Sequence, residues 1–148
     1  MNKRFILSIF ILFFSLNLLS VELGLIGGKM SNPSEFNYGL SGGFGLFIPF
    51  LKMELEFGPL SELELNVMTI ALKIRHKFGK LAPFAAVGVG TQFEKLGFDF
   101  DQYEFFTLIG GGVHLYFASL FSVRADIRFQ NFSDRNRIRF GAGVFFHL

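Results

Sequence analysis

From Val21 to Leu148 the chain alternates between apolar and polar positions with a period close to two. The stretch SVRADIRFQ, residues 122–130, illustrates the pattern, because its even-numbered positions are polar and its odd-numbered positions are apolar. Successive side chains of a β-strand point to opposite faces, so this period predicts strands with one apolar and one polar face. A sustained 3.6-residue period, which would indicate helices, does not occur after residue 20.

The alternating segments recur at regular intervals and predict eight strands. These strands are 21–30, 36–48, 51–58, 66–78, 83–94, 103–117, 121–132 and 136–148. The connections at 31–35, 59–65, 95–102 and 133–135 are longer or more polar than those near 49–50, 79–80 and 118–120. Long loops at one end and tight turns at the other are typical of membrane β-barrels. We therefore predict one all-β domain over residues 21–148, an eight-stranded antiparallel up-and-down transmembrane β-barrel.

The first twenty residues have the layout of a secretory signal peptide. Lys3 and Arg4 precede an apolar stretch that runs from Phe5 to Leu19 and is short for a membrane-spanning helix. We predict that residues 1–20 form a signal peptide that is cleaved after Ser20. The alternative is an uncleaved anchor, and in either case the rest of the chain is exported.

Composition excludes several classes of function. Hydrophobic residues make up 51% of the chain and charged residues 18%, and the net charge is only +2, so we expect no nucleic-acid partner. The chain has no cysteine, which excludes disulfides and thiolate metal sites. We predict no cofactor and no metal.

Three features indicate which face of the barrel points inward. The 23 Phe residues would crowd the interior of a barrel of about eight strands, which side chains only just fill. The polar face contains many glycines, which leave room for long side chains. It also carries both signs of charge, as buried charges require. We therefore expect the apolar face to contact lipid, and strand eight to pair with strand one because an open edge is excluded in hydrocarbon. The predicted lumen charges are Glu54, Glu56, Lys73, Arg75, Glu104, Arg124, Asp126, Arg128, Arg137 and Arg139.

Four segments carry a resemblance to a known family: LAPFAAVGVGTQF (81–93), FFTLIGGGVHLYF (105–117), FSVRADIRFQNF (121–132) and RFGAGVFFHL (139–148). Together they resemble the small eight-stranded outer-membrane β-barrels, the porin-like and opacity-like family. The resemblance implies export, a packed lumen and folding by the barrel-assembly machinery. It also implies that the alternate positions of the last strand form the assembly signal, namely Phe140, Ala142, Val144, Phe146 and Leu148.

Enzyme chemistry on such a barrel requires a histidine beside a serine nucleophile or a carboxylate. The candidates are His76 and His147, expected near the periplasmic end, and His114, expected in the lumen without a serine two residues away. We therefore predict that the protein is not an enzyme.

The most individual connection is EKLGFDFDQY, residues 94–103, in which two aromatic and two acidic residues alternate. These residues are Phe98, Asp99, Phe100 and Asp101. They allow a surface recognition tip or a weak divalent-cation site, but we favour a plain extension of the two strands as a hairpin. The GVG and GGG runs are not phosphate loops, because no helix follows them.

The sequence predicts an integral outer-membrane barrel with a structural or adhesive role in the envelope. The lumen charges are interpreted as a static plug of salt bridges rather than an ion path. One alternative is a small pore or transporter for ions or small solutes, and another is a secreted soluble barrel that binds an apolar ligand. The expected partners are outer-membrane lipid, the barrel-assembly machinery and an unidentified extracellular ligand.

Overall fold

The computed structural model describes residues 20–32, 34–46, 48, 50–60, 64–94 and 100–148. Within these ranges the chain forms eight strands and one short 3₁₀ helix. They are β1 (Val21–Met30), β2 (Glu35–Gly45), β3 (Leu51–Pro59), β4 (Asn66–Arg75), β5 (Leu81–Phe93), η1 (Phe100–Gln102), β6 (Glu104–Tyr116), β7 (Phe121–Asn131) and β8 (Asn136–His147). No helix in the described part is long and apolar enough to cross a membrane. Residues 1–19 of the predicted signal peptide lie outside the described residues.

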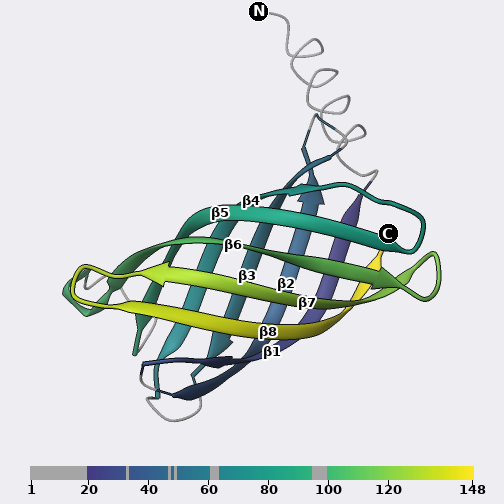
Figure 1. Cartoon of the computed structure of the whole chain (residues 1–148). Coiled ribbons are helices and arrows are strands. Elements are labelled where there is room, and N and C mark those ends of the chain that lie inside the picture. Colours follow the sequence, from purple (N-terminus) through teal and green to yellow (C-terminus); the bar gives the residue numbers. More distant parts are fainter. Residues whose placement is uncertain (1–19, 33, 47, 49, 61–63, 95–99) are drawn as a thin grey trace, which may run out of the picture.

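The eight strands close into one antiparallel barrel in which each strand pairs with its sequence neighbours and β8 pairs with β1 (Figure 1). The prediction of an all-β up-and-down barrel is confirmed. We call the end with the β1–β2, β3–β4, β5–β6 and β7–β8 connections the loop end. The opposite end, where β1 starts and β8 finishes, is called the turn end.

Several strand boundaries differ from the predicted ones. β2 ends at Gly45 and β4 at Arg75, both three residues earlier than expected, whereas β5 starts at Leu81, two residues earlier than expected, so that Pro83 lies inside the strand and not at its first position. A proline inside a strand is tolerated where its missing N–H has no partner to lose. The carbonyl oxygen of Pro83 accepts a hydrogen bond from His76 N, and the nitrogen of Pro83 points to the same side of the strand. That side faces the chain beyond Arg75, the last paired residue of β4, so no bond of the β4–β5 ladder is lost there.

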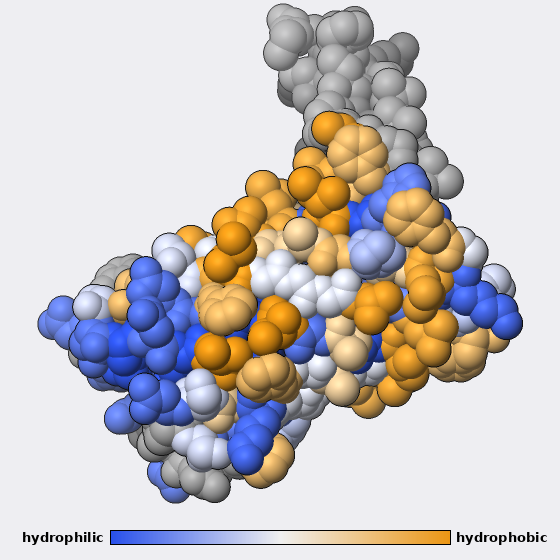
Figure 2. All heavy atoms as spheres, in the orientation of Figure 1, coloured by the Kyte–Doolittle hydropathy of each residue, from blue (hydrophilic) through white to orange (hydrophobic). Residues whose placement is uncertain are grey.

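The alternation of the sequence becomes an inside and an outside. In β7 the polar residues Ser122, Arg124 and Arg128 are buried in the barrel, whereas Phe121 and Phe129 are 41% and 49% exposed on the outer wall. The same alternation holds along most of the other strands, but at the loop end of β5 four consecutive residues, 90–93, are all buried. Figure 2 shows the resulting surface, with apolar residues across the wall and hydrophilic residues gathered at the loop end of β7 and β8. The barrel is therefore polar within and apolar without, as predicted.

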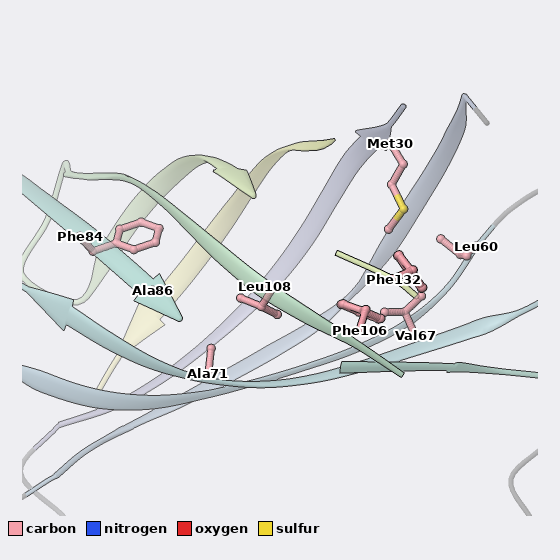
Figure 3. Packing of buried hydrophobic residues seen from close by; sticks show 9 residues of the cluster. All are labelled: Met30, Leu60, Val67, Ala71, Phe84, Ala86, Phe106, Leu108 and Phe132. Carbon is pink, nitrogen blue, oxygen red and sulfur yellow. The ribbon is translucent and has the colours of Figure 1, made fainter. Parts of the chain in front are cut away.

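An apolar cluster fills the loop end of the lumen. Met30, Leu60, Val67, Phe106 and Phe132 converge there from three strands and two connections, and all are less than 10% exposed (Figure 3). The rings of Phe106 and Phe132 lie 4.6 Å apart. The sequence analysis did not anticipate this cluster, because it treated the inward face as polar throughout.

Replacing Phe106 with Ala is expected to lower the free energy of unfolding by about 3–5 kcal/mol, the usual cost of removing a buried aromatic side chain. The matched control is Phe105→Ala, because Phe105 directly precedes Phe106 in β6 and is 63% exposed on the outer wall. Urea unfolding of the barrel in detergent micelles measures both variants. Equal losses in the two variants would contradict the packing described above.

Candidate functional site

Six charged side chains meet in the middle of the lumen and form what we call the central network. They are Glu54 and Glu56 on β3, Arg124, Asp126 and Arg128 on β7, and Arg139 on β8. Each acid contacts at least two arginines, and each arginine at least two acids. The three negative and three positive charges balance, which matters because an unpaired charge in a dry interior is very costly.

The geometry of the central network is tight. Glu54 accepts hydrogen bonds from Arg124 Nη1 at 2.7 Å and from Arg128 Nη2 at 2.5 Å. Glu56 accepts from Arg124 Nη2 and Arg139 Nη1, both at 2.6 Å. Asp126 accepts from Arg139 Nη2 at 3.2 Å. Residues two apart on one strand share a face, so β3 and β7 each deliver their charges to the same space.

A second cluster lies toward the turn end and surrounds Glu22. Its carboxylate pairs with Arg75 Nη1 at 2.5 Å, Lys52 Nζ at 3.7 Å and Lys73, and Lys73 also donates to Glu54 at 2.7 Å. Glu22 and Lys52 were not among the predicted lumen charges. Strand alternation contained the signal, because Glu22 stands between the outward residues Val21 and Leu23.

Two predicted lumen charges do not belong to either cluster. Glu104 lies at the loop-end rim, where it pairs with Arg135 at 2.6 Å and its side chain is 36% exposed, so it stands apart from the central network. Arg137 is buried, but it donates to the carbonyl oxygen of Asn32 at 3.0 Å and lies over the Phe132 ring, apart from the central network. Both sit near strand ends, where alternation does not indicate depth.

Glycines on the inner wall provide the space that the charges occupy. A Cβ on Gly141 would stand 2.8 Å from Asp126 Oδ1, and one on Gly110 would stand 2.9 Å from Arg128 Cγ. A Cβ on Gly43 would stand 2.6 Å from Glu22 Cγ. These positions therefore need glycine, because larger residues would displace the charged side chains. The sequence analysis gave the same reason for the glycines of the polar face.

A serine lies between two histidines at the turn end. Ser122 Oγ is 2.9 Å from His114 Nδ1 and 2.7 Å from His147 Nε2, and His147 Nδ1 is 3.5 Å from Glu22 Oε2. The sequence analysis missed this group because Ser122 is eight residues from His114 and reaches it across the β6–β7 hairpin. Ser122, His147 and Glu22 follow one another in the order nucleophile, base and acid that a serine enzyme uses. However, Ser122 and His114 are fully buried, and Ser122 Oγ already contacts both histidine rings. A substrate has no access to Ser122 in this arrangement.

The lumen is filled at both ends. The apolar cluster occupies the loop end, and at the turn end the rings of Tyr116 and His147 lie 4.7 Å apart beside the buried Phe145. Two grooves of about 490 and 540 Å³ are both lined mainly by outward-facing residues. The described side chains thus leave the middle of the barrel packed with ion pairs.

No protein-family model and no curated protein matches the sequence. Solved structures do match. The N-terminal β-barrel domain of Pseudomonas aeruginosa OprF is 21% identical, with a TM-score of 0.74 over 88% of this chain and 98% of that one. Ail, the attachment invasion locus protein of Yersinia pestis, is 11% identical, with a TM-score of 0.60 over 87% and 97%. The outer membrane enzyme PagL is 11% identical, with a TM-score of 0.54 over 84% and 98%.

This chain has the fold of the small eight-stranded outer-membrane barrels. At these identities the likeness establishes the fold alone. The three barrels named above include an attachment protein and an enzyme, so the fold does not determine the activity.

The structure describes only part of the connection 94–103, which the sequence analysis singled out as the most individual loop. Phe98 and Asp99 lie outside the described residues, whereas Phe100 begins η1 and Asp101 is exposed. The predicted hairpin extension is wrong for residues 100–102, because these form a 3₁₀ turn between β5 and β6. In the described part, no three His, Cys, Asp or Glu residues are arranged to hold a metal ion.

The predicted assembly positions of this outer-membrane-type barrel lie along the outer wall of β8. Phe140 and Val144 are 58% and 54% exposed, and Ala142 faces outward between them. Phe146 packs against Phe121 of β7, with ring centroids 5.1 Å apart. Leu148 exchanges backbone hydrogen bonds with Val21, at 3.2 and 2.8 Å, so the last residue completes the seam between β8 and β1.

Replacing Glu54 with Gln is expected to lower the free energy of unfolding by about 3–5 kcal/mol, because it leaves buried Arg124 and Arg128 short of a counter-charge. Glu104→Gln removes one partner of the exposed rim pair and should cost less than about 1 kcal/mol. Urea unfolding in micelles compares the two variants. A loss for Glu54→Gln no larger than that for Glu104→Gln would show that the central network does not hold the lumen together.

Proposed function

We propose that this chain is an integral outer-membrane β-barrel with a sealed lumen and a structural or adhesive role in the cell envelope. The observation that carries the proposal is the polarity of the wall: the arginines and carboxylates face inward and the large apolar side chains face outward. Leu25, Phe57 and Phe140, for example, are each more than 40% exposed. In water such a surface would aggregate, whereas in a bilayer it is the favourable one.

The height of the apolar wall supports insertion in a membrane. In β7 the outward residues are apolar from Phe121 to Phe129. At ~3.3 Å per residue this stretch is about 26 Å along the strand. With a strand tilt of about 40° it spans about 20 Å along the barrel axis, close to the ~25 Å apolar band of outer-membrane barrels. Lipid is therefore the proposed partner of the outer wall.

Packing of the lumen supports a static barrel over the alternative of a small pore. An open path would require the ion pairs of the central network to separate and the apolar cluster at the loop end to withdraw. Each step exposes charges or apolar surface that the folded barrel buries. The interior also argues against a soluble carrier of an apolar ligand, because such a ligand would have to displace paired charges.

A non-enzymatic role fits the burial of Ser122, the one described serine that contacts histidine nitrogens in the lumen. Biogenesis through the barrel-assembly machinery, with the outward positions of β8 as the recognised signal, remains part of the proposal. So does export directed by residues 1–20.

The loop end is the proposed site of contact with an extracellular partner. The connections 31–34, 60–65, 94–103 and 132–135 together contain six acidic residues and two basic ones. The short connections 76–80 and 117–120 contain two lysines and no acid. Among the described residues of these connections, Glu64, Glu94, Asp101 and Asp134 are exposed acids, and they favour a partner with exposed basic groups, since opposite charges steer encounter.

In planar lipid bilayers the purified barrel is expected to insert without steady conductance, because both ends of the lumen are filled. Single-channel recording measures this, and retention of strand circular dichroism in extruded vesicles verifies insertion. A stable, large open state of the unmodified protein would contradict the sealed lumen and favour the pore.

Exchanging Glu64, Glu94 and Asp101 for their amides is expected to reduce binding of cells that display the barrel to a surface coated with a lysine- and arginine-rich protein at least severalfold, because the exposed negative charge at the loop end is lost. The matched control replaces Lys77 and Lys80 at the turn end with Gln, which should leave binding unchanged. Microscopy of adherent cells gives the readout. If wild-type cells do not bind, or all variants bind alike, the adhesive role fails and the structural role stands.

A further inference from the structure

The outer wall of β6, β7 and β8 carries two neighbouring rows of side chains that differ in polarity. The apolar row consists of Val87, Ile109, Phe129 and Ile138, which strand register places side by side across β5 to β8. One step nearer the loops, the register places Thr107, Asn131 and Asn136 side by side in a polar row. All three residues of the polar row are exposed.

These rows line a groove of about 540 Å³ on the outer wall. Its volume lies within the range of small-molecule sites. The apolar row is well exposed, with Val87, Ile109 and Phe129 at 56%, 62% and 49%. Ser31 and Asn32, from the β1–β2 connection, complete the polar side of the groove. The groove is therefore apolar toward the middle of the wall and hydrogen-bonding toward the loop end.

The polar row is uncharged, and the arginines near it already have hydrogen-bond partners within the protein. Arg135 bonds Glu104 at 2.6 Å and Asp134 at 2.9 Å, and Arg137 turns inward to the carbonyl oxygen of Asn32. Asparagine amides and the threonine hydroxyl donate to neutral acceptors such as carbonyl oxygens. The groove thus matches an uncharged carbonyl group attached to an alkyl chain better than it matches a phosphate.

We infer that this groove binds one acyl chain of a membrane lipid, with the carbonyl of its ester or amide linkage accepting hydrogen bonds from the polar row. The inference rests on the proposed membrane location, because the groove is continuous with the apolar wall that faces the bilayer. Beyond general contact between the wall and the bilayer, the inference assigns one defined binding position for a single lipid. The polar row marks the depth at which the hydrocarbon region gives way to the carbonyl layer.

Native mass spectrometry from detergent micelles tests the inference with two probes that share a headgroup. The probes are dimyristoyl phosphatidylcholine, which has ester carbonyls, and its dialkyl ether analogue, which has none. Wild type is expected to retain one diester lipid about tenfold better than the ether, the ratio that one to two hydrogen bonds supply. Asn131→Leu combined with Asn136→Leu should abolish this preference.

Val87→Phe fills the groove and should remove the retained lipid altogether. The control is Val123→Phe, which makes the same change at an outward position of β7 that does not line the groove and should leave retention unchanged. Equal retention of the two probes by wild type, or an adduct that survives Val87→Phe, would overturn the inference. Insertion into vesicles is scored separately, so a barrel that inserts without retaining lipid defeats this inference alone, and a barrel that does not insert defeats the proposed function.

Discussion

Charge pairing inside a closed wall is the constraint on which the rest of this structure depends. Three carboxylates and three guanidinium groups occupy the centre of the barrel at hydrogen-bonding distances. None of them is buried alone, since leaving one buried charge without its partner costs about 3–5 kcal/mol, a large share of a domain's stability. They can be buried together only if β3, β7 and β8 are brought to a common lumen, which requires the β8–β1 seam that closes the cylinder.

This constraint also accounts for the composition of the wall. Long arginines need space, so glycines stand opposite them, and the aromatic volume that a soluble protein would place in its core is moved outward. The largest group of exceptions is at the loop end, where Phe106, Phe132 and Met30 turn inward and replace ion pairs with apolar packing. Phe84 and Phe145 are also buried, beside His114 toward the turn end. The lumen is thereby divided into an apolar loop end, a balanced centre and a turn end where three cations share Glu22.

The same division separates the surfaces that other molecules can reach from the groups that are buried in the lumen. Ser122 contacts two histidines in a reactive order, but burial withholds it from substrates. The outer wall and the loop end are exposed instead, and they differ in chemistry: the wall is apolar with a hydrogen-bonding row near its edge, and the loops are acidic. The surfaces open to contact therefore lie on the outside of the barrel, whereas the described side chains of the inside are packed against one another.

The sequence by itself determined the strand count, the closed meander and the inward direction of Glu54, Arg124 and Arg128, because a period of two specifies which face each side chain takes. It did not determine depth along the barrel. Glu104 and Arg128 both occupy inward positions of their strands, yet Glu104 lies at the rim and Arg128 at the centre. Only the register and tilt of the strands decide this difference in depth. Tertiary structure alone joined Ser122 to His147, a contact that depends on the β7–β8 register, and Glu22 to Lys73, which lie on β1 and β4 and meet only across the lumen. It also placed Thr107, Asn131 and Asn136 in one row, since a row across a sheet is a property of pairing and not of any single strand.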